Sequence, residues 1–162
     1  MPQPPGPVDH RQVFDDLVRY ETELWNELDA QLRAEVEVPL GSFNVLLVLE
    51  RIPDCRVNDI AAALAITIGG ASQSVDRLER RGLCTRRPHP VDRRATIIEL
   101  TDEGRARCAA AGLVFDRELA VRFGAAALTP DQLRQLADAL AALRGRSRSQ
   151  GQGRGPGAAS RA

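Results

Sequence analysis

The order of structural signals from Val57 to Thr101 constrains the fold of this chain more than any other part of the sequence. A short apolar segment at 57–64 predicts one helix, and a second predicted helix begins at Thr67 and ends at Gly82. The Thr67 hydroxyl can accept a free amide hydrogen of the first turn, and Gly82 can adopt the left-handed conformation that often ends a helix. Two β-like runs follow, at 83–87 and 95–100.

The segment between the two β-like runs is strongly charged. It carries Asp92, Arg93 and Arg94 ahead of a β-branched run, which is typical of a hairpin loop. An Arg side chain at such a tip can enter a narrow minor groove of DNA, where negative potential is concentrated. A solvated charged turn is the alternative, which the surrounding order of elements disfavours. Helix, turn, helix and two-stranded wing is the order of a winged helix-turn-helix, so we expect a mainly α fold of that kind.

The start of the second predicted helix has an unusual composition. Gly69 and Gly70 lie in its first turn, where each lowers helix propensity by about 1 kcal/mol relative to Ala. They are either tolerated slack at a helix start or a means for the helix N-terminus to approach phosphate and base edges closely. Ser72 and Gln73 follow, and a Gln amide can bridge the donor and acceptor of adenine in the major groove.

The same stretch carries Val-Asp-Arg-Leu-Glu-Arg-Arg-Gly at 75–82, Arg87 ahead of Asp92-Arg93-Arg94, and Leu-Thr-Asp-Glu-Gly at 100–104. With these motifs it resembles the multiple antibiotic resistance regulator (MarR) family. The likeness extends loosely over residues 12–144. It implies a homodimeric, mostly helical regulator with a winged module, usually a repressor whose affinity for DNA drops when a small molecule binds.

The resemblance also implies roles for individual residues. Ser72 and Gln73 stand where family members read the major groove, and Arg93 stands where the wing enters the minor groove. Asp92 and Arg94 would stabilise the wing. The expected DNA contacts comprise the start of the second helix, one Arg farther along it and the Arg residues of the wing: Thr67, Gly69, Gly70, Ser72, Gln73, Arg77, Arg86, Arg87, Arg93 and Arg94.

Further helices are predicted on both sides of this stretch. Apolar residues recur at three- and four-residue spacings over 9–35 and give one apolar stripe. Residues 43–51 are apolar nearly all round, as in a core helix, and Thr-Pro-Asp-Gln at 129–132 predicts a capped last helix. The stripes predict a dimer built from the chain ends, or else they fold back on the core of a monomer. The expected organisation is a disordered lead (1–8), one domain (9–144) with dimerisation helices (9–35 and 101–144) and a winged core (43–100), and a disordered basic tail (145–162).

Composition is that of a soluble globular protein. The chain has 162 residues, of which 43% are hydrophobic and 27% charged. We expect a cytoplasmic protein without a membrane partner, because no apolar run reaches the ~18 residues of a membrane span and the N-terminus lacks a secretory pattern. The net charge is zero, yet Arg dominates from Gln73 to Arg94. Phosphate responds to that local excess, since exposed charges are screened beyond ~8 Å.

Cofactors, metals and catalysis are not expected. Cys55, Cys84 and Cys108 are odd in number and lack C-x-x-C spacing, so a disulfide framework is disfavoured, and Cys84 is interpreted as a small buried hydrophobe rather than a redox sensor. The two histidines, His10 and His89, lie far apart, and no cluster has zinc spacing. No nucleophile elbow, phosphate loop or dinucleotide motif is present, so we do not expect an enzyme.

The expected function is that of a sequence-specific DNA-binding transcriptional regulator. It would act as a homodimer on double-stranded DNA with a pseudo-palindromic operator, as a repressor released by a small aromatic or phenolic ligand. The alternative is a winged-helix module for protein interaction without specific DNA binding. Trp25, the only Trp, is the candidate ligand contact, although a lone Trp on an apolar stripe is also typical of a core.

Overall fold

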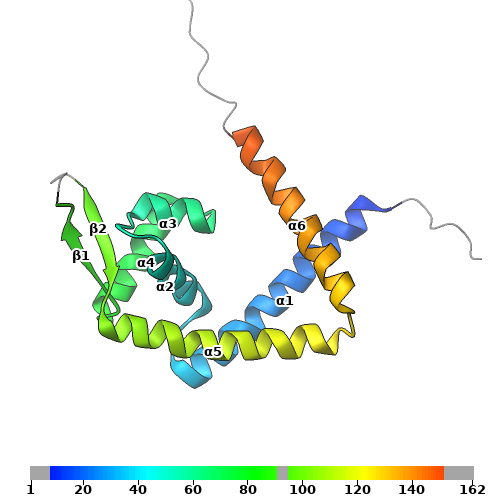
Figure 1. Ribbon diagram of the computed structural model, residues 1–162, viewed down its shortest axis with the longest axis horizontal. Coiled ribbons are helices and arrows are strands. Elements are labelled where there is room, and N and C mark those ends of the chain that lie inside the picture. Colours follow the sequence, from blue (N-terminus) through cyan, green and yellow to red (C-terminus); the bar gives the residue numbers. More distant parts are fainter. Residues whose placement is uncertain (1–7, 91–94, 152–162) are drawn as a thin grey trace, which may run out of the picture. The chain divides into compact units, whose positions relative to one another are not determined.

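The computed structural model describes residues 8–90 and 95–151, with side chains to residue 145 (Figure 1). The described part is mostly helical with one two-stranded sheet, which confirms the predicted fold class. The chain divides into two compact units, Met1–Leu119 and Ala120–Ala162, at a point where the sequence has no linker signal. The elements are α1 (His10–Val36), α2 (Leu40–Arg51), α3 (Val57–Leu64), α4 (Ile68–Arg80), β1 (Cys84–Pro88), β2 (Thr96–Leu100), α5 (Asp102–Ala125) and α6 (Pro130–Gly151).

Helix α2 supplies much of the core of the first unit. Its residues Phe43, Val45, Leu46 and Val48 are all buried, as its nearly continuous apolar sequence predicts. Fully burying a side chain of this kind stabilises the fold by about 1.5–3 kcal/mol. The other elements of the unit add Leu28, Leu32, Ile60, Val75, Leu78, Ile98, Cys108 and Ala111 to the same core.

Helix α2 begins at Leu40, three residues before the apolar segment 43–51 that predicted it. Pro39 has φ −58°, which suits the residue that precedes a helix. The Leu40 amide, one of the free donors of a helix start, donates to Asp29 Oδ1 of α1 at 2.8 Å. A carboxylate 11 residues earlier in the chain therefore caps α2.

Helices α3 and α4 form the predicted helix-turn-helix. Ala65 ends α3 in the left-handed region with φ 54°. Thr67 caps α4 as predicted, because its Oγ1 accepts the Gly70 amide hydrogen at an N–O distance of 3.1 Å. Gly82 follows α4 with φ 69°, which confirms the left-handed stop.

Strands β1 and β2 pair antiparallel as the predicted wing, with Cys84 opposite Leu100 and Pro88 opposite Thr96. Strand β2 is also held on its outer side, because the Ile98 amide donates to the Cys55 carbonyl oxygen at 2.8 Å. The winged module, meaning α3, α4, β1 and β2, is thus joined by backbone hydrogen bonds as well as by its core.

Thr101 and Gly104 join the wing to α5. Thr101 Oγ1 donates to the Gly82 carbonyl oxygen at 2.6 Å and accepts the Gly104 amide hydrogen, with an N–O distance of 3.0 Å. The Thr101 amide donates to the Leu83 carbonyl oxygen at 3.2 Å. These contacts give the Leu-Thr-x-x-Gly motif a structural reason, since one hydroxyl caps α5 and fastens it to the turn after α4.

Helix α6 begins with the predicted capping box. The Thr129 amide donates to Gln132 Oε1 at 2.8 Å, and the Gln132 amide donates to Thr129 Oγ1 at 3.3 Å. The helix continues to Gly151, so residues 145–151 are helical rather than part of the expected tail. Arg and Gln have good helix propensity, and the lack of apolar residues removes a packing face without ending a helix. No helix within the described residues is long and apolar enough to cross a membrane.

Candidate nucleic-acid interface

Helix α4 has one buried and one exposed face. Ala71, Val75 and Leu78 are buried at helical spacing. Gln73 and Arg77 are exposed and lie one turn apart on the opposite side, with Arg80 continuing the same face. Ser72 is half-buried on the flank. An α-helix fits the major groove of DNA, and this face presents an amide and guanidinium groups to it.

The first turn of α4 is open on its outer side. A Cβ built on Gly69 would have no neighbour within 4 Å, so the fold itself does not need glycine there. A Cβ on Gly70 would lie 3.2 Å from Thr67 Oγ1, the atom that caps the helix. Gly70 therefore has a local packing reason, whereas Gly69 leaves space in front of the helix N-terminus.

Arg77 is held along α4 by a short chain of hydrogen bonds. Its Nη2 donates to Ser74 Oγ at 2.8 Å, and Ser74 Oγ donates to the Gly70 carbonyl oxygen at 2.9 Å. Among the residues that the structure describes, Arg77 makes no ion pair with a carboxylate. Its charge is thus available on the exposed face of α4.

Arg86 of β1 has two carboxylate partners on α4, which we did not expect for a DNA contact. Its guanidinium binds Asp76 Oδ1 at 2.5 Å and also binds the Glu79 carboxylate. Burial would lower the pKa of Arg86, but the hydrogen bonds to Asp76 and Glu79 raise it overall. The side chain is 28% exposed, less than either partner.

Arg87, the next residue of β1, is also paired within the chain. Its Nη2 lies 2.6 Å from Glu99 Oε1 of β2 and 3.2 Å from Asp54 Oδ1 of the α2–α3 connection. The hydrogen bond to Glu99 is the main reason that the pKa of Arg87 is raised. Successive strand residues point to opposite faces of a sheet, so the two Arg side chains bind different neighbours.

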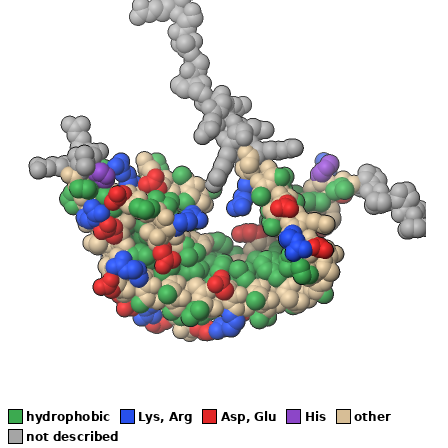
Figure 2. Space-filling view, viewed as in Figure 1, with side chains coloured by type: hydrophobic (Ala, Val, Ile, Leu, Met, Phe, Trp, Pro, Cys, Tyr) green, Lys and Arg blue, Asp and Glu red, His purple; other side chains and the backbone are tan. Residues whose placement is uncertain are grey.

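The remaining predicted wing residues, Asp92, Arg93 and Arg94, lie outside the described residues, and their roles stay predictions. Basic and acidic side chains are interspersed on the face of the molecule that Figure 2 shows. Arg86 and Arg87 are paired with carboxylates, whereas Arg77 is hydrogen-bonded to Ser74. The surface formed by α4 and the wing is therefore not one uniform basic patch.

Trp25, the candidate ligand contact, is 41% exposed, so it is not a core residue of this chain. Trp25 lies on α1 and is not among the residues that line a cavity found in the first unit. That cavity has a volume of about 340 Å³ and lies where α2, β2 and α5 meet. Its lining residues are Leu49, Glu50, Ile52, Pro53, Asp54, Ile98, Glu99, Leu100 and Arg105.

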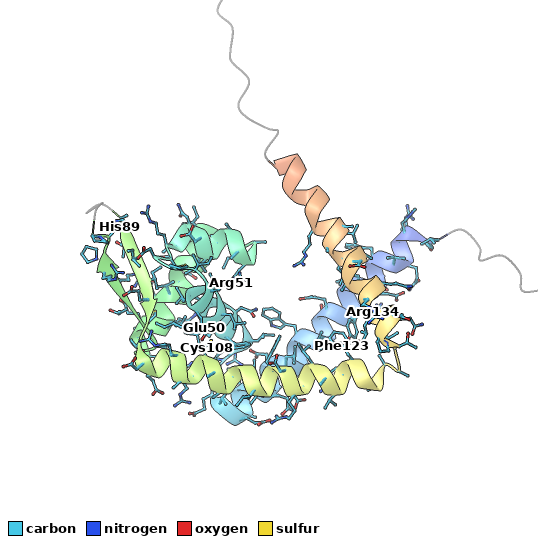
Figure 3. All side chains as sticks on the ribbon, viewed as in Figure 1. Glu50, Arg51, His89, Cys108, Phe123 and Arg134 are labelled. Carbon is cyan, nitrogen blue, oxygen red and sulfur yellow. The ribbon has the colours of Figure 1, made fainter. Side chains whose placement is uncertain are left out.

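The three cysteines are free and buried. Burial is the main reason that the pKa values of Cys55, Cys84 and Cys108 are each raised from 9.0 to about 11. A neighbouring carboxylate adds to the shift at Cys108, whose Sγ lies 3.8 Å from Glu50 Oε2 (Figure 3). The thiolate is the reactive form, so these environments disfavour redox chemistry. Within the described residues, no cluster of His, Cys, Asp and Glu is arranged to hold a metal ion.

Native thiols are expected to resist a thiol reagent at pH 8 and to react fully in denaturant. The raised pKa values also make stability depend on pH, because the unfolded chain loses its thiol protons before the folded chain does. The contribution of these thiols is present below pH 9 and is lost as the pH rises towards 11. Ellman's reagent with and without denaturant, and urea unfolding at pH 8, 9 and 10, measure both effects. One rapidly reacting thiol in the native protein would contradict the assignment.

Known proteins are similar in sequence and in fold to the helix-turn-helix region described above. A model of the MarR family matches residues 37–95, which include α2, α3, α4 and β1. A solved structure of the transcriptional repressor CouR, bound to a 23-mer DNA duplex, is 29% identical, with a TM-score of 0.72 over 86% of this chain and 99% of that chain. Residues 37–95 of the chain are therefore similar to the MarR family. The matched residues include α4, whose exposed face is described above, and β1 of the wing.

Two further relatives show how far the likeness extends. The HTH-type transcriptional regulator BilQ of Clostridium symbiosum (strain WAL-14163) is 33% identical over 67 residues, which is 41% of this chain and 46% of BilQ. Sco3205 of Streptomyces coelicolor, a MarR family regulator solved with DNA, is 24% identical, with a TM-score of 0.76 over 89% of this chain and 91% of that chain. The chain spans about half the length of the curated relatives it matches, 46% and 60%.

Proposed function

We propose that this chain is a sequence-specific DNA-binding transcriptional regulator of the MarR family. The observation that carries the proposal is the exposed face of α4, where Gln73 and Arg77 stand opposite a fully buried face. The buried face fixes the helix on the core, so the exposed face can be presented to a groove without rearrangement. The wing beside α4 and the DNA present in the CouR structure support the same function.

We further propose that the active form is a homodimer, because the apolar stripe of α1 is covered along only half of its length. The stripe is buried at Leu28 and Leu32 but exposed at Phe14, Leu17 and Val18, where Phe14 is 68% exposed. A second copy of α1 presents the same bare stripe, so a two-fold pairing would cover both. Two modules related in this way would read an inverted repeat.

Gln73→Ala is expected to relax specificity at one or two base pairs and to lose about 1–3 kcal/mol of binding free energy on the preferred duplex, because a Gln amide reads a base edge.

Arg93→Ala is expected to weaken binding to many sequences and to reduce the salt dependence of binding, because a wing Arg interacts with the DNA backbone and with the negative potential of the groove. Fluorescence anisotropy with single-base variants and a salt series measures both. The reverse pattern would show that the groove assignments are wrong.

A protein-interaction module is the second candidate, and the zero net charge with interspersed acids and bases favours it (Figure 2). Salt distinguishes the two. A complex that tracks phosphates loses affinity steeply, with log K falling by about 0.9 per neutralised phosphate for each decade of salt. Duplex binding without that dependence, or no duplex binding at all, favours the protein-interaction module.

We also propose that the regulator is a repressor released by a small aromatic or phenolic ligand that contacts Trp25. The indole is 41% exposed on α1 and offers a flat apolar surface. A ligand releases DNA only if it prefers the conformation that does not fit the operator. Salicylate should therefore change Trp25 fluorescence and lower DNA affinity, and cyclohexanecarboxylate is the non-aromatic control. Unchanged fluorescence and DNA affinity with salicylate would exclude this kind of effector.

A further inference from the structure

Arg86 connects the wing to α4 through two ion pairs. It extends from β1 to α4, where Asp76 and Glu79 lie three residues apart on one flank of the helix. Both carboxylates bind its guanidinium, with Asp76 Oδ1 at 2.5 Å. Nη1 donates to Glu79 and Nη2 to Asp76, so a phosphate would have to compete with two carboxylates for this guanidinium.

The position of Arg86 along β1 gives these contacts a mechanical effect. Cys84 and Arg86 lie on the same face of the strand, which is the face towards α4, because side chains alternate. Cys84 Sγ lies 3.7 Å from the Val75 carbonyl oxygen, and the Leu83 amide donates to the Leu78 carbonyl oxygen at 3.0 Å. The base of β1 is therefore fixed on α4 near residue 84, and Arg86 supplies a second attachment farther out.

A second attachment to α4 restricts the tilt of β1 relative to this helix, whereas the bond from Ile98 to Cys55 holds the wing to the α2–α3 connection instead. Strand residues rise by about 3.3 Å each, so a tilt of about 10° at Cys84 moves Pro88 by about 2 Å. Such a displacement exceeds the tolerance of a hydrogen bond. The angle of the wing to α4 thus decides whether both elements reach their grooves together.

We propose that Arg86, through Asp76 and Glu79, is a positioning residue that sets the angle between the wing and α4. The inference rests on the proposed DNA-binding function and gives Arg86 a different role from the predicted DNA contact. Arg87 attaches the other face of β1 to Glu99 and Asp54, and it does not replace the link to α4.

The carboxylates allow a test in which the two roles predict opposite signs. If Arg86 bound phosphate, the double variant Asp76→Asn/Glu79→Gln would bind the selected duplex more tightly, because two negative charges near DNA are gone. We expect about tenfold weaker binding instead, equal to the loss in Arg86→Gln. The variant that combines Arg86→Gln with Asp76→Asn and Glu79→Gln should bind the duplex no more weakly than Arg86→Gln alone, because the three groups act as one unit.

The salt series supplies a second readout, with Arg77→Gln as the matched control. Arg77 is exposed on α4 and should bind phosphate, so its variant should lose about 0.9 from the salt slope. Arg86→Gln should keep the wild-type slope while losing affinity. Tighter binding by the carboxylate double variant, or a reduced slope in Arg86→Gln, would overturn the proposal. Circular dichroism checks that each variant is folded. If Arg86→Gln does not fold, the affinity of the Asp76→Asn/Glu79→Gln variant still tests the proposal.

A measurement without DNA separates this inference from the proposed function. Spin labels on Ala63→Cys of α3 and Thr96→Cys of β2 occupy exposed positions, while the native cysteines are buried. The inter-label distance should be narrowly distributed with Arg86 and at least twice as broad in Arg86→Gln. Equal widths would overturn the positioning role. A broadened distribution in a protein that binds no duplex would retain the positioning role and reject the DNA-binding function.

Discussion

Gly104→Ala is expected to destabilise the fold by about 3 kcal/mol or more, because overpacking against backbone leaves no side chain that can move aside. A Cβ on Gly104 would lie 1.9 Å from the Leu83 carbonyl oxygen and 2.9 Å from its carbonyl carbon. Leu83 cannot shift freely, since its carbonyl accepts the Thr101 amide hydrogen and its amide donates to Leu78. Urea unfolding followed by circular dichroism measures the loss, and a variant that does not fold agrees with it.

Gly112→Ala is the matched control on the same helix. A Cβ there would meet no atom within 4 Å, so the change should stabilise α5 by about 0.5–1 kcal/mol through helix propensity alone. Equal effects of the two substitutions would show that the close approach of α5 to Leu83 is not present in solution.

Phe14→Asp and Leu17→Asp are each expected to abolish the dimer and to weaken operator binding at least 100-fold. Their side chains are 68% and 45% exposed on the bare half of the α1 stripe, where a buried carboxylate would have no partner across the pairing. Joining two binding modules raises affinity by 10²–10⁴, and that gain is lost with the dimer. Sedimentation velocity and fluorescence anisotropy measure the two effects.

Glu23→Ala is the control for the dimer variants, because Glu23 is exposed on the side of α1 opposite Phe14. It should leave both the sedimentation coefficient and the DNA affinity unchanged. A monomeric Phe14→Asp variant that still bound its operator at full affinity would show that DNA recognition does not need the dimer.

The predictions from sequence succeeded where the cause of a feature is local. Thr67, Gly82 and Thr129 act at helix ends as predicted, because a cap depends on residues within three positions of it. The buried face of α2 followed from its continuous apolar residues. The start of α2 did not, because the Leu40 amide is capped by Asp29 from another helix.

The candidate site was predictable only in part for the same reason. The exposed position of Gln73 follows from helical periodicity once the buried residues of α4 are known. The pairing of Arg86 with Asp76 and Glu79 depends on how the hairpin packs on α4, and that of Arg87 with Glu99 on strand register. One signal was available in the sequence. Arg86 lies two residues after Cys84, so their side chains must lie on the same face of the strand.

Selection of bound duplexes from a random DNA pool by the full chain tests sequence-specific DNA binding most directly. We expect enrichment of an inverted repeat with half-site centres about 10 base pairs apart, because two symmetric α4 helices must enter successive major grooves on one side of the duplex. The enriched duplex should bind more tightly than the starting pool by a factor of about 10³ or more. Recovered sequences indistinguishable from the starting pool after repeated rounds would contradict a sequence-specific regulator.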